Sequence, residues 1–565
     1  MSALNRFFER QLELGEAAPF CLAGGTSLLE AGEDPDQLYF LRSGRLAVRL
    51  AGPNPRLVLI HPGEPIGEMA VLAGVPYSAH VFALRDCELL AMERETFLAA
   101  VQSDGELLVD LSKLVLTRLR ESGNDQEATA RRVFGFFAVS EGVHVRPLVD
   151  GIGEALRRLG YRTATLGAEE GPSSAEWFAN VEGRNDLVLY AAEFGDQAWR
   201  GLVRRQVDAV IKIASGADRP PRALAPDGGD PGDDLILLQA PDTKAPSGSA
   251  AWVAALAPGR LFQVRRGATA DIERVARIIA GRAVGLVLSG GAARAYAHVG
   301  VIQAMHDIGA PIDFLGGVSM GAIIGAGVAM GWSDEELDHR LHQAFVDSNP
   351  VDDLTVPLVA IARGGKVRER LATHFGDRQV EDLWLPFFCV STNLTTGTQQ
   401  IFRRGRVSEV LLASLSLPGL LPPVTMGDDV LVDGALLNNF PADIMRAFHT
   451  GPIVGVDVGR GRSIEAADVA GPSSVVRWLL SGGWRSGAPI VSVLMRAATV
   501  TADHQVAAAH EVTDVLIQPE VDHIEIRDWK AYEPAVIEGH RAAMAAFAKL
   551  AGPVTDLRPV SAASD

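Results

Sequence analysis

The stretch IDFLGGVSMGAIIGAGVAMG, residues 312–331, contains the motif on which the interpretation of this chain depends. An apolar run typical of a buried strand ends at Val318, a G-x-S-x-G pentapeptide is centred on Ser319, and an apolar helix-like run follows. The flanking glycines, Gly317 and Gly321, leave room for a sharp strand-to-helix turn. Such an elbow exposes a serine hydroxyl at the positive end of the following helix, so it predicts a nucleophile for acyl transfer.

A glycine-rich segment about thirty residues earlier has the properties of an oxyanion site. SGGAAR, residues 289–294, ends an apolar strand-like run and opens a helix. Free backbone N–H groups accumulate at such a junction, and we expect those around Gly290, Gly291 and Ala292 to hold the oxyanion. Arg294 is expected to hold this loop in place through the N–H donors of its guanidinium group.

A base for the serine proton is predicted at the end of another apolar run, VLVDG. This run places Asp433 at the end of a strand, followed by Gly434 and Ala435. Partial desolvation would raise the pKa of this carboxyl and make it a better acceptor for a hydroxyl proton. Taken alone, the Asp-Gly pair fits an ordinary turn equally well.

Together, SGGAAR, GVSMG and DGA, in this order, resemble the motifs of the patatin-like phospholipases. The resemblance implies a parallel or mixed sheet wrapped by helices and a Ser319–Asp433 dyad without a catalytic histidine. It also implies that no metal or other cofactor is required. The family usually has glycine where Ala292 and Ala295 stand, so a positive φ at either position would cost about 1 kcal/mol or more.

Residues from about 20 to 93 are expected to form short strands, including a hairpin around a Ser43-Gly44 turn. Within them, GEDPDQLYFLRSGRLAV and IGEMAVLAGVPYSA resemble a cyclic-nucleotide-binding β-roll. The residues that this resemblance assigns to a nucleotide pocket are Gly67, Glu68, Ala70, Tyr77 and Ser78. Tyr77 occupies the position of the family's phosphate-binding arginine, and loss of that contact favours a β-roll that no longer binds cyclic nucleotide.

The order of the parts resembles neuropathy target esterase and its bacterial relatives. We therefore expect a multidomain protein with an N-terminal β-roll with helices, an α/β middle region and a patatin-like α/β catalytic domain. Residues 123–130, GNDQEATA, suit a linker. The expected domains are the β-roll at 1–125, a middle region of unassigned role at 126–280, the catalytic core at 281–460, and a C-terminal part at 461–565 that packs on the core and ends in disordered residues.

Composition excludes several function classes. The 565 residues carry a formal net charge of -18, which argues against a nucleic-acid binder. The three cysteines match no zinc or redox spacing, and the N-terminus lacks the apolar core of a signal peptide. We expect a cytoplasmic protein that is at most peripheral at membranes and meets its lipid substrate by transient surface contact. Nothing in the sequence indicates its oligomeric state.

The sequence thus predicts a serine acyl hydrolase that cleaves carboxylic esters of lysophospholipids or phospholipids through an acyl-enzyme on Ser319. Three alternatives stay open. A Ser-His-Asp esterase would recruit His449, His504 or His510. A catalytically impaired sensor would use the β-roll to bind a ligand. Acyl transfer to an acceptor other than water would proceed through the same acyl-enzyme.

Overall fold

The chain is described by a computed structural model that forms two compact units. The first comprises Met1–Ala214 and Ala223–Leu235, and the second comprises Ser215–Arg222 and Ile236–Asp565. The residues that the structure describes are 3–49, 57–60, 62–121, 132–171, 175–221, 232–356, 359–459 and 502–557. The expected linker at 123–130 and the last residues of the expected disordered tail lie outside these ranges, and the expected domain bounds remain predictions.

The first unit begins with an antiparallel β-roll of two four-stranded sheets, in the orders β1-β8-β3-β6 and β2-β7-β4-β5. Alternating buried and partly exposed side chains, as in β3, give each sheet one face for the core. Its strands are β1 (Ala17–Leu22), β2 (Ser27–Leu29), β3 (Gln37–Ser43), β4 (Leu46–Arg49), β5 (Leu57–Ile60), β6 (Pro65–Ile66), β7 (His80–Ala83) and β8 (Cys87–Glu93). Its helices are α1 (Ala3–Leu14), α2 (Glu68–Ala73), α3 (Arg94–Ser103) and α4 (Gly105–Glu121).

The predicted hairpin around Ser43-Gly44 is wrong. Both strands form, but β3 pairs with β6 and β8 whereas β4 pairs with β5 and β7. Gly44 turns the chain from one sheet into the other at a φ of 98°, where a side chain would collide with the backbone of Asp86 and Cys87. A local turn signal cannot distinguish such a corner from a hairpin, because the distinction depends on strands elsewhere in the chain.

The rest of the first unit is an α/β region with parallel strands in the order β10-β11-β9-β12, of which β11 and β9 are fully buried. Burial on both faces explains why these strands are continuous apolar runs. Its elements are β9 (Val133–Ala138), α5 (Arg146–Arg158), β10 (Thr163–Leu166), α6 (Ala175–Arg184), β11 (Leu187–Ala192), α7 (Gln197–Gln206) and β12 (Ala209–Ser215).

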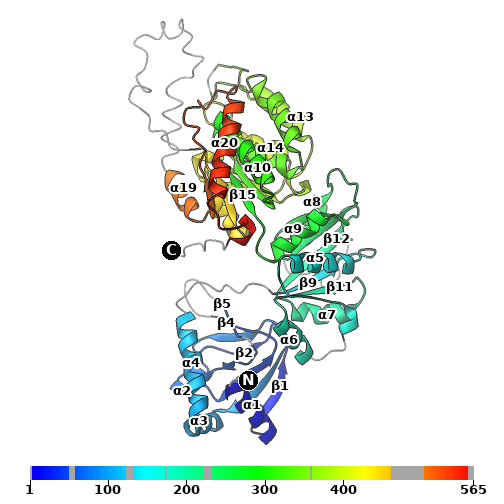
Figure 1. Cartoon of the computed structure of the whole chain (residues 1–565), viewed down its shortest axis with the longest axis vertical. Helices are drawn as coiled ribbons and strands as arrows, with labels where there is room; N and C mark the ends of the chain where they lie inside the picture. The colour runs from blue at the N-terminus through cyan, green and yellow to red at the C-terminus, as the bar shows by residue number, and fades with distance from the viewer. Residues whose placement is uncertain are drawn as a thin grey trace. The chain divides into compact units, whose positions relative to one another are not determined.

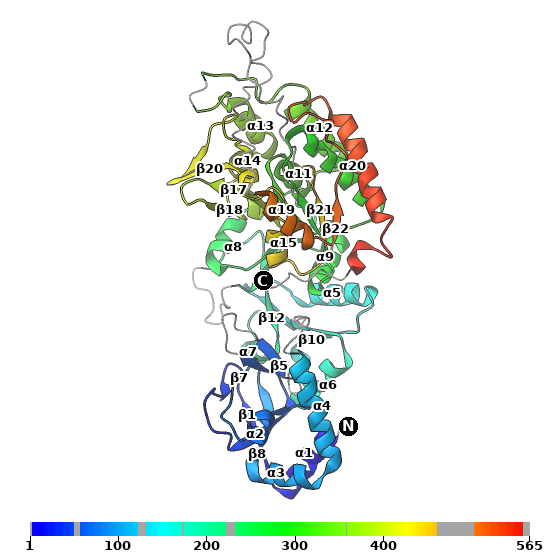
Figure 2. The same ribbon diagram turned by 90° about the vertical axis from the view of Figure 1, so that its left-hand side faces the viewer.

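The second unit is built on a sheet in the order β19-β20-β17-β16-β15-β21-β22, with β18 paired to β17. Strands β17, β16, β15, β21 and β22 are parallel, whereas β18 and β20 run antiparallel to β17. Figure 2 shows β17, β18 and β20 on the opposite side of this unit from α20. The strands of this sheet are β15 (Gly285–Leu288), β16 (Phe314–Val318), β17 (Phe387–Asn393), β18 (Thr398–Phe402), β19 (Val424–Met426), β20 (Asp429–Asp433), β21 (Ile453–Val456) and β22 (Val515–Ile517). Strands β13 (Asp234–Gln239) and β14 (Leu261–Arg265) pair with each other and are not part of this sheet.

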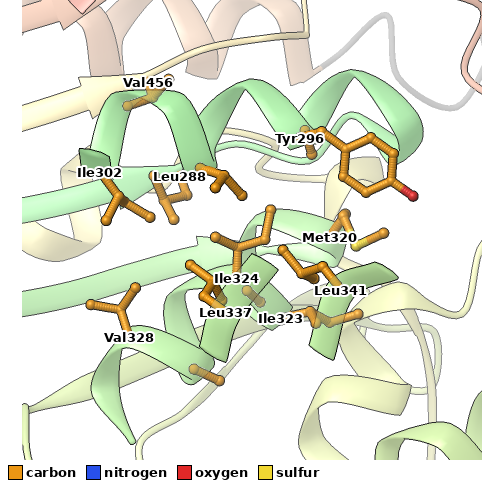
Figure 3. Packing of buried hydrophobic residues seen from close by; sticks show 14 of the residues in the cluster. Leu288, Tyr296, Ile302, Met320, Ile323, Ile324, Val328, Leu337, Leu341 and Val456 are labelled. Atoms are coloured by element: carbon orange, nitrogen blue, oxygen red, sulfur yellow. The ribbon is translucent and has the colours of Figure 1, made fainter. Parts of the chain in front are cut away.

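Helices cover this sheet and enclose one large apolar core. Figure 3 shows Leu288 of β15 and Ile302 of α10 facing Met320, Ile323 and Ile324 of α11. The core therefore joins the helix after the glycine-rich loop to the helix after Ser319. The helices are α8 (Ser249–Leu256), α9 (Thr269–Ile279), η2 (Ala292–Tyr296), α10 (Ala297–Asp307), α11 (Ser319–Ala329), α12 (Asp334–Leu341), η3 (His342–Val346), α13 (Gly365–Phe375), η4 (Val380–Asp382), α14 (Val407–Leu415), η5 (Gly434–Leu436), α15 (Ala442–Phe448), α19 (Ala502–Glu511), α20 (Tyr532–Phe547) and η7 (Val554–Asp556).

Helices α10 and α20 lie side by side at an unusually close approach (Figure 1). A Cβ atom on Gly300 of α10 would collide with the carbonyl oxygen of Val536 in α20. In the same way, a Cβ atom on Gly539 would collide with the carbonyl oxygen of Ala297. Glycine on both helices therefore lets the backbones touch, and this contact fixes the helix that follows the glycine-rich loop.

Replacing Gly300 by alanine should force these helices apart. We expect Gly300→Ala to lower the free energy of unfolding by about 1–3 kcal/mol, the usual cost of overpacking, measured by thermal and denaturant unfolding. Gly183→Ala is the control, because Gly183 is an exposed helical glycine with no neighbouring atom within 4 Å of its added Cβ. This control should gain about 0.5–1 kcal/mol. Wild-type stability in Gly300→Ala would contradict the close helix contact.

Candidate active site

Strand register brings the serine and aspartate motifs together. Val318, the last residue of β16, lies opposite Val390 of β17, and the next residue of β17, Ser391, lies opposite Asp433 of β20. Ser319, the residue after Val318, is therefore brought close to Asp433. On the other side, Leu288 at the end of β15 is paired with Gly317, so the glycine-rich loop begins beside the elbow.

Ser319 occupies a strained turn at the start of α11. Its φ is 55°, in the left-handed region, and its backbone N–H donates to the hydroxyl of Ser414 at 3.0 Å. Its own hydroxyl donates to Oδ2 of Asp433 at 2.8 Å. Gly321 permits the elbow, because a Cβ there would collide with the carbonyl oxygens of Leu288 and Ser289. The GVSMG motif is thus packed directly against the end of the strand that leads into the glycine-rich loop.

Asp433 is a buried carboxylate with few partners. The residue is 1% exposed. Its carboxylate accepts one hydrogen bond from the Ser319 hydroxyl and another, at 2.9 Å, from the N–H of Ala435. Burial raises the pKa of Asp433 to about 6, against the lowering effect of these two hydrogen bonds. Gly434 starts the following turn, where a side chain would collide with the carbonyl oxygen of Val390. The carboxyl therefore combines a raised basicity with direct contact to the serine.

The glycine-rich loop presents two free donors next to this pair, at Gly291 and Ala292. The N–H of Gly290, which was also expected to hold the oxyanion, instead donates to the carbonyl oxygen of Asn439 at 3.3 Å. Gly290 lies against Ser319, since a Cβ on it would be 3.3 Å from Cβ of Ser319. No described residue accepts a hydrogen bond from the N–H groups of Gly291 or Ala292. Ala292 adopts a φ of 50°, in the left-handed region. The conformational cost of having alanine rather than glycine therefore applies at this position. Ala295 has no positive φ and is buried in the core.

Arg294 connects this loop to a distant part of the chain. Its Nε donates to the carbonyl oxygen of Ile524 at 2.8 Å, and its Nη2 donates to that of Asp522 at 3.1 Å. The N–H of Ala293 adds a bond to the carbonyl oxygen of Ile526. These bonds fix the position of the loop on the 522–526 segment.

The histidines that a triad would use are engaged elsewhere. Nε2 of His449 lies 3.2 Å from the carbonyl oxygen of Pro452, and burial lowers the pKa of this histidine to about 4. Nε2 of His510 lies 3.0 Å from Asp457. The side chain of His504 lies outside the described part of the structure. Neither His449 nor His510 bonds to the Ser319–Asp433 pair.

Three residues near Ser319 or the glycine-rich loop were not selected from the sequence as site residues. Ser414 holds the Ser319 backbone, His298 donates from Nε2 to the carbonyl oxygen of Ser289 at 2.8 Å, and Asn439 donates to Gly290. Burial lowers the pKa of His298 to about 4, so its ring is neutral at pH 7. Asn439 and His298 had a local signal, because they closely follow Asp433 and the SGGAAR segment respectively, and His298 was expected to be a packed or hydrogen-bonded histidine. Ser414 had no such signal.

The residues assigned to a nucleotide pocket in the β-roll lie around Tyr77. Its hydroxyl donates to the carbonyl oxygen of Gln37 at 2.8 Å, and a Cβ on Gly67 would lie 2.9 Å from its ring. Glu68 and Ala70 are buried in α2, whereas Ser78 is exposed. The Tyr77 ring therefore fills the space next to the turn that starts α2.

Neither a metal cluster nor a membrane-spanning helix is found in the described ranges. No group of three or more His, Cys, Asp or Glu side chains there gathers as metal ligands would. Likewise, none of the helices described there is long and apolar enough to cross a bilayer.

Comparisons with known proteins match one region in each of the two units. Residues 286–446 match the family of patatin-like phospholipases, and residues 20–104 match the cyclic nucleotide-binding domain. An NTE family protein of Mycobacterium tuberculosis (strain CDC 1551 / Oshkosh) is 34% identical over 92% of this chain and 90% of its own length. A lysophospholipase of Aspergillus fumigatus is 25% identical over 77% of this chain but 35% of its own length. Patatin-like phospholipase domain-containing protein 7 of Rattus norvegicus is 26% identical over 93% of this chain and 45% of its own length.

The burial of Asp433 predicts a pH dependence of reaction at Ser319. Only the ionised carboxylate can accept the serine proton, so the rate should fall as pH decreases through about 6, following one protonation. We would measure the rate of covalent labelling by a fluorophosphonate between pH 5 and pH 8. A rate that stays constant down to pH 5 would contradict the raised pKa of Asp433.

The same burial predicts a cost in stability. Because folding raises the pKa of Asp433 from 3.8 to about 6, the folded state binds the proton more tightly, and stability falls as pH rises from about 4 to about 6. Asp433→Asn removes this cost and should be more stable than wild type at pH 8, by about 3 kcal/mol at most. Denaturant unfolding should show that the difference disappears below pH 4.

Proposed function

Since this chain belongs to the NTE family and is a lipid esterase of the patatin-like type, we propose that it hydrolyses the carboxylic esters of lysophospholipids or phospholipids with Ser319 and Asp433. The observation that carries this proposal is the 2.8 Å hydrogen bond from the Ser319 hydroxyl to a carboxylate that is 1% exposed. The name of the A. fumigatus relative, a lysophospholipase, supports the choice of substrate class.

The proposed reaction proceeds in two halves. Ser319 Oγ attacks the ester carbonyl while its proton passes to Asp433, and the N–H groups of Gly291 and Ala292 hold the oxyanion. Collapse breaks the ester bond, and the leaving alcohol takes the proton from Asp433. Asp433 then deprotonates a water that attacks the acyl-enzyme, and the fatty acid leaves as Ser319 regains its proton.

Geometry favours this dyad over a Ser-His-Asp triad. In a triad the histidine lies between the nucleophile and the carboxylate. Here the serine hydroxyl bonds directly to Asp433, while His449 and His510 bond to Pro452 and Asp457. The same direct bond, together with two free donors in the loop, favours an enzyme over a catalytically impaired sensor. Transfer of the acyl group to an acceptor other than water would use the same first half-reaction.

Hydrolysis of lysophosphatidylcholine tests the proposal. Wild type should release fatty acid, and Ser319→Ala and Asp433→Asn should each lower the rate by about 1,000-fold or more, because each removes half of the proton-transfer pair. His510→Asn is the matched control and should stay within a few-fold of wild type. A loss in His510→Asn as large as that in Ser319→Ala would favour a triad instead.

We also propose that the β-roll does not bind a cyclic nucleotide. An aromatic ring with a neutral hydroxyl stands where a guanidinium would pair with the phosphate, and the Tyr77 hydroxyl is already bonded to Gln37. Burial raises the pKa of Tyr77 to about 12, so the ring carries no charge at pH 7.

Cyclic AMP or cyclic GMP should therefore change neither the rate of fatty-acid release nor the melting temperature of the full chain. A ligand present at 100 times its Kd would stabilise the folded state by about 2.7 kcal/mol, which a thermal shift detects easily. A saturable shift with either nucleotide would show that the β-roll has kept its ligand.

A further inference from the structure

The glycine-rich loop is held in place by donors that reach its carbonyl oxygens in turn. The carbonyl of Ser289 accepts from His298 at 2.8 Å, that of Gly290 from Asn439 at 3.2 Å, and that of Gly291 from the N–H of Arg294 at 3.1 Å. The two free N–H groups of the loop belong to the last two of these peptide units. The bonds to the carbonyl oxygens therefore decide where the free N–H groups point.

Asn439 makes the side-chain contact to the central peptide unit of this loop. Its Nδ2 donates to the Gly290 carbonyl oxygen, and its own carbonyl oxygen accepts from the Gly290 N–H at 3.3 Å. A Cβ on Gly290 would lie 2.5 Å from Asn439 Oδ1 and 3.3 Å from Cβ of Ser319. Asn439 thus contacts Gly290 through both its side chain and its backbone, on the side of Gly290 that faces Ser319.

The planarity of the peptide bond links this contact to the oxyanion. In a trans peptide the carbonyl and the following N–H point in opposite directions, so the bond to the Gly290 carbonyl fixes the direction of the Gly291 N–H. A hydrogen bond to the carbonyl also polarises the unit and strengthens its N–H as a donor. We propose that Asn439 is a positioning residue that aims the Gly291 N–H at the substrate's oxyanion, an inference that rests on the proposed function.

Stability alone does not explain an asparagine at this position. Its Oδ1 is buried and has no hydrogen-bond partner among the described residues, and a buried acceptor without a partner lowers the stability of a fold. An apolar side chain there would avoid this cost. A side chain whose buried Oδ1 has no partner, while its Nδ2 holds the loop next to Ser319, fits a role in the reaction.

The experiment compares binding before and after the tetrahedral addition. A trifluoromethyl ketone with a fatty acyl chain adds Ser319 Oγ to its carbonyl carbon, and the resulting oxyanion needs the loop donors. A non-hydrolysable ether analogue of lysophosphatidylcholine binds without forming an oxyanion. For Asn439→Ala and the near-isosteric Asn439→Asp, we expect ketone affinity and kcat to fall about 10- to 100-fold, less than for complete removal of one oxyanion donor. We expect ether-lipid affinity and KM to change less than three-fold.

Asn438→Ala is the matched control. Asn438 is the neighbouring asparagine and is buried, but its side chain bonds to Gln399, Asp443 and the N–H of Phe440, away from the loop. We expect this variant to lower the melting temperature while the ratio of ketone affinity to ether-lipid affinity stays that of wild type. Asn439→Ala should instead alter this ratio, because it removes the bond to the Gly290 carbonyl.

Each outcome has a defined meaning. A wild-type ratio in Asn439→Ala, or an equal change of the ratio in Asn438→Ala, would overturn the positioning role and leave the proposed function in place. If the wild-type chain reacts with neither the ketone nor a fluorophosphonate at Ser319, the proposed function fails and the positioning role fails with it.

Discussion

The second unit depends on one carboxylate that is kept out of water next to a serine hydroxyl. A buried ionisable group is unfavourable unless hydrogen bonds compensate it, and Asp433 receives only two, from Ser319 and Ala435. The register of β16, β17 and β20 brings the two residues together, because Asp433 lies opposite Ser391, one residue beyond the pair of Val318 with Val390. The basicity and the position of the Asp433 carboxylate thus arise from the same three strands.

The parts of this site that sequence reasoning located are those with a local signal. An elbow needs small residues at fixed offsets from its serine, so Gly317, Ser319 and Gly321 stand out within five residues. Buried strands in a sheet covered on both faces are continuous apolar runs, which is why β15 and β20 and the motifs at their ends could be predicted. The resemblance to a known family then supplied the pairing of Ser319 with Asp433.

The parts that could not be predicted depend on contacts between distant segments. Ser414 reaches Ser319 from α14, and Arg294 reaches the 522–526 segment, yet neither contact has a sequence spacing that would indicate it. The apparent hairpin at Gly44 failed for the same reason, since the partners of β3 and β4 lie farther along the chain. Ala292 is a further case, because only the backbone of the folded loop reveals its left-handed conformation.

The attachment of the glycine-rich loop to residues near the C-terminus has a consequence for synthesis on the ribosome. The partner of Arg294 at Ile524 is translated 230 residues later, and the glycine contact of α10 requires α20, later still. At 5–20 residues per second, a nascent chain would carry the complete elbow for roughly ten seconds or more before the loop gains these supports. The order of translation therefore delays assembly of the site until Ile524 and α20 have been made.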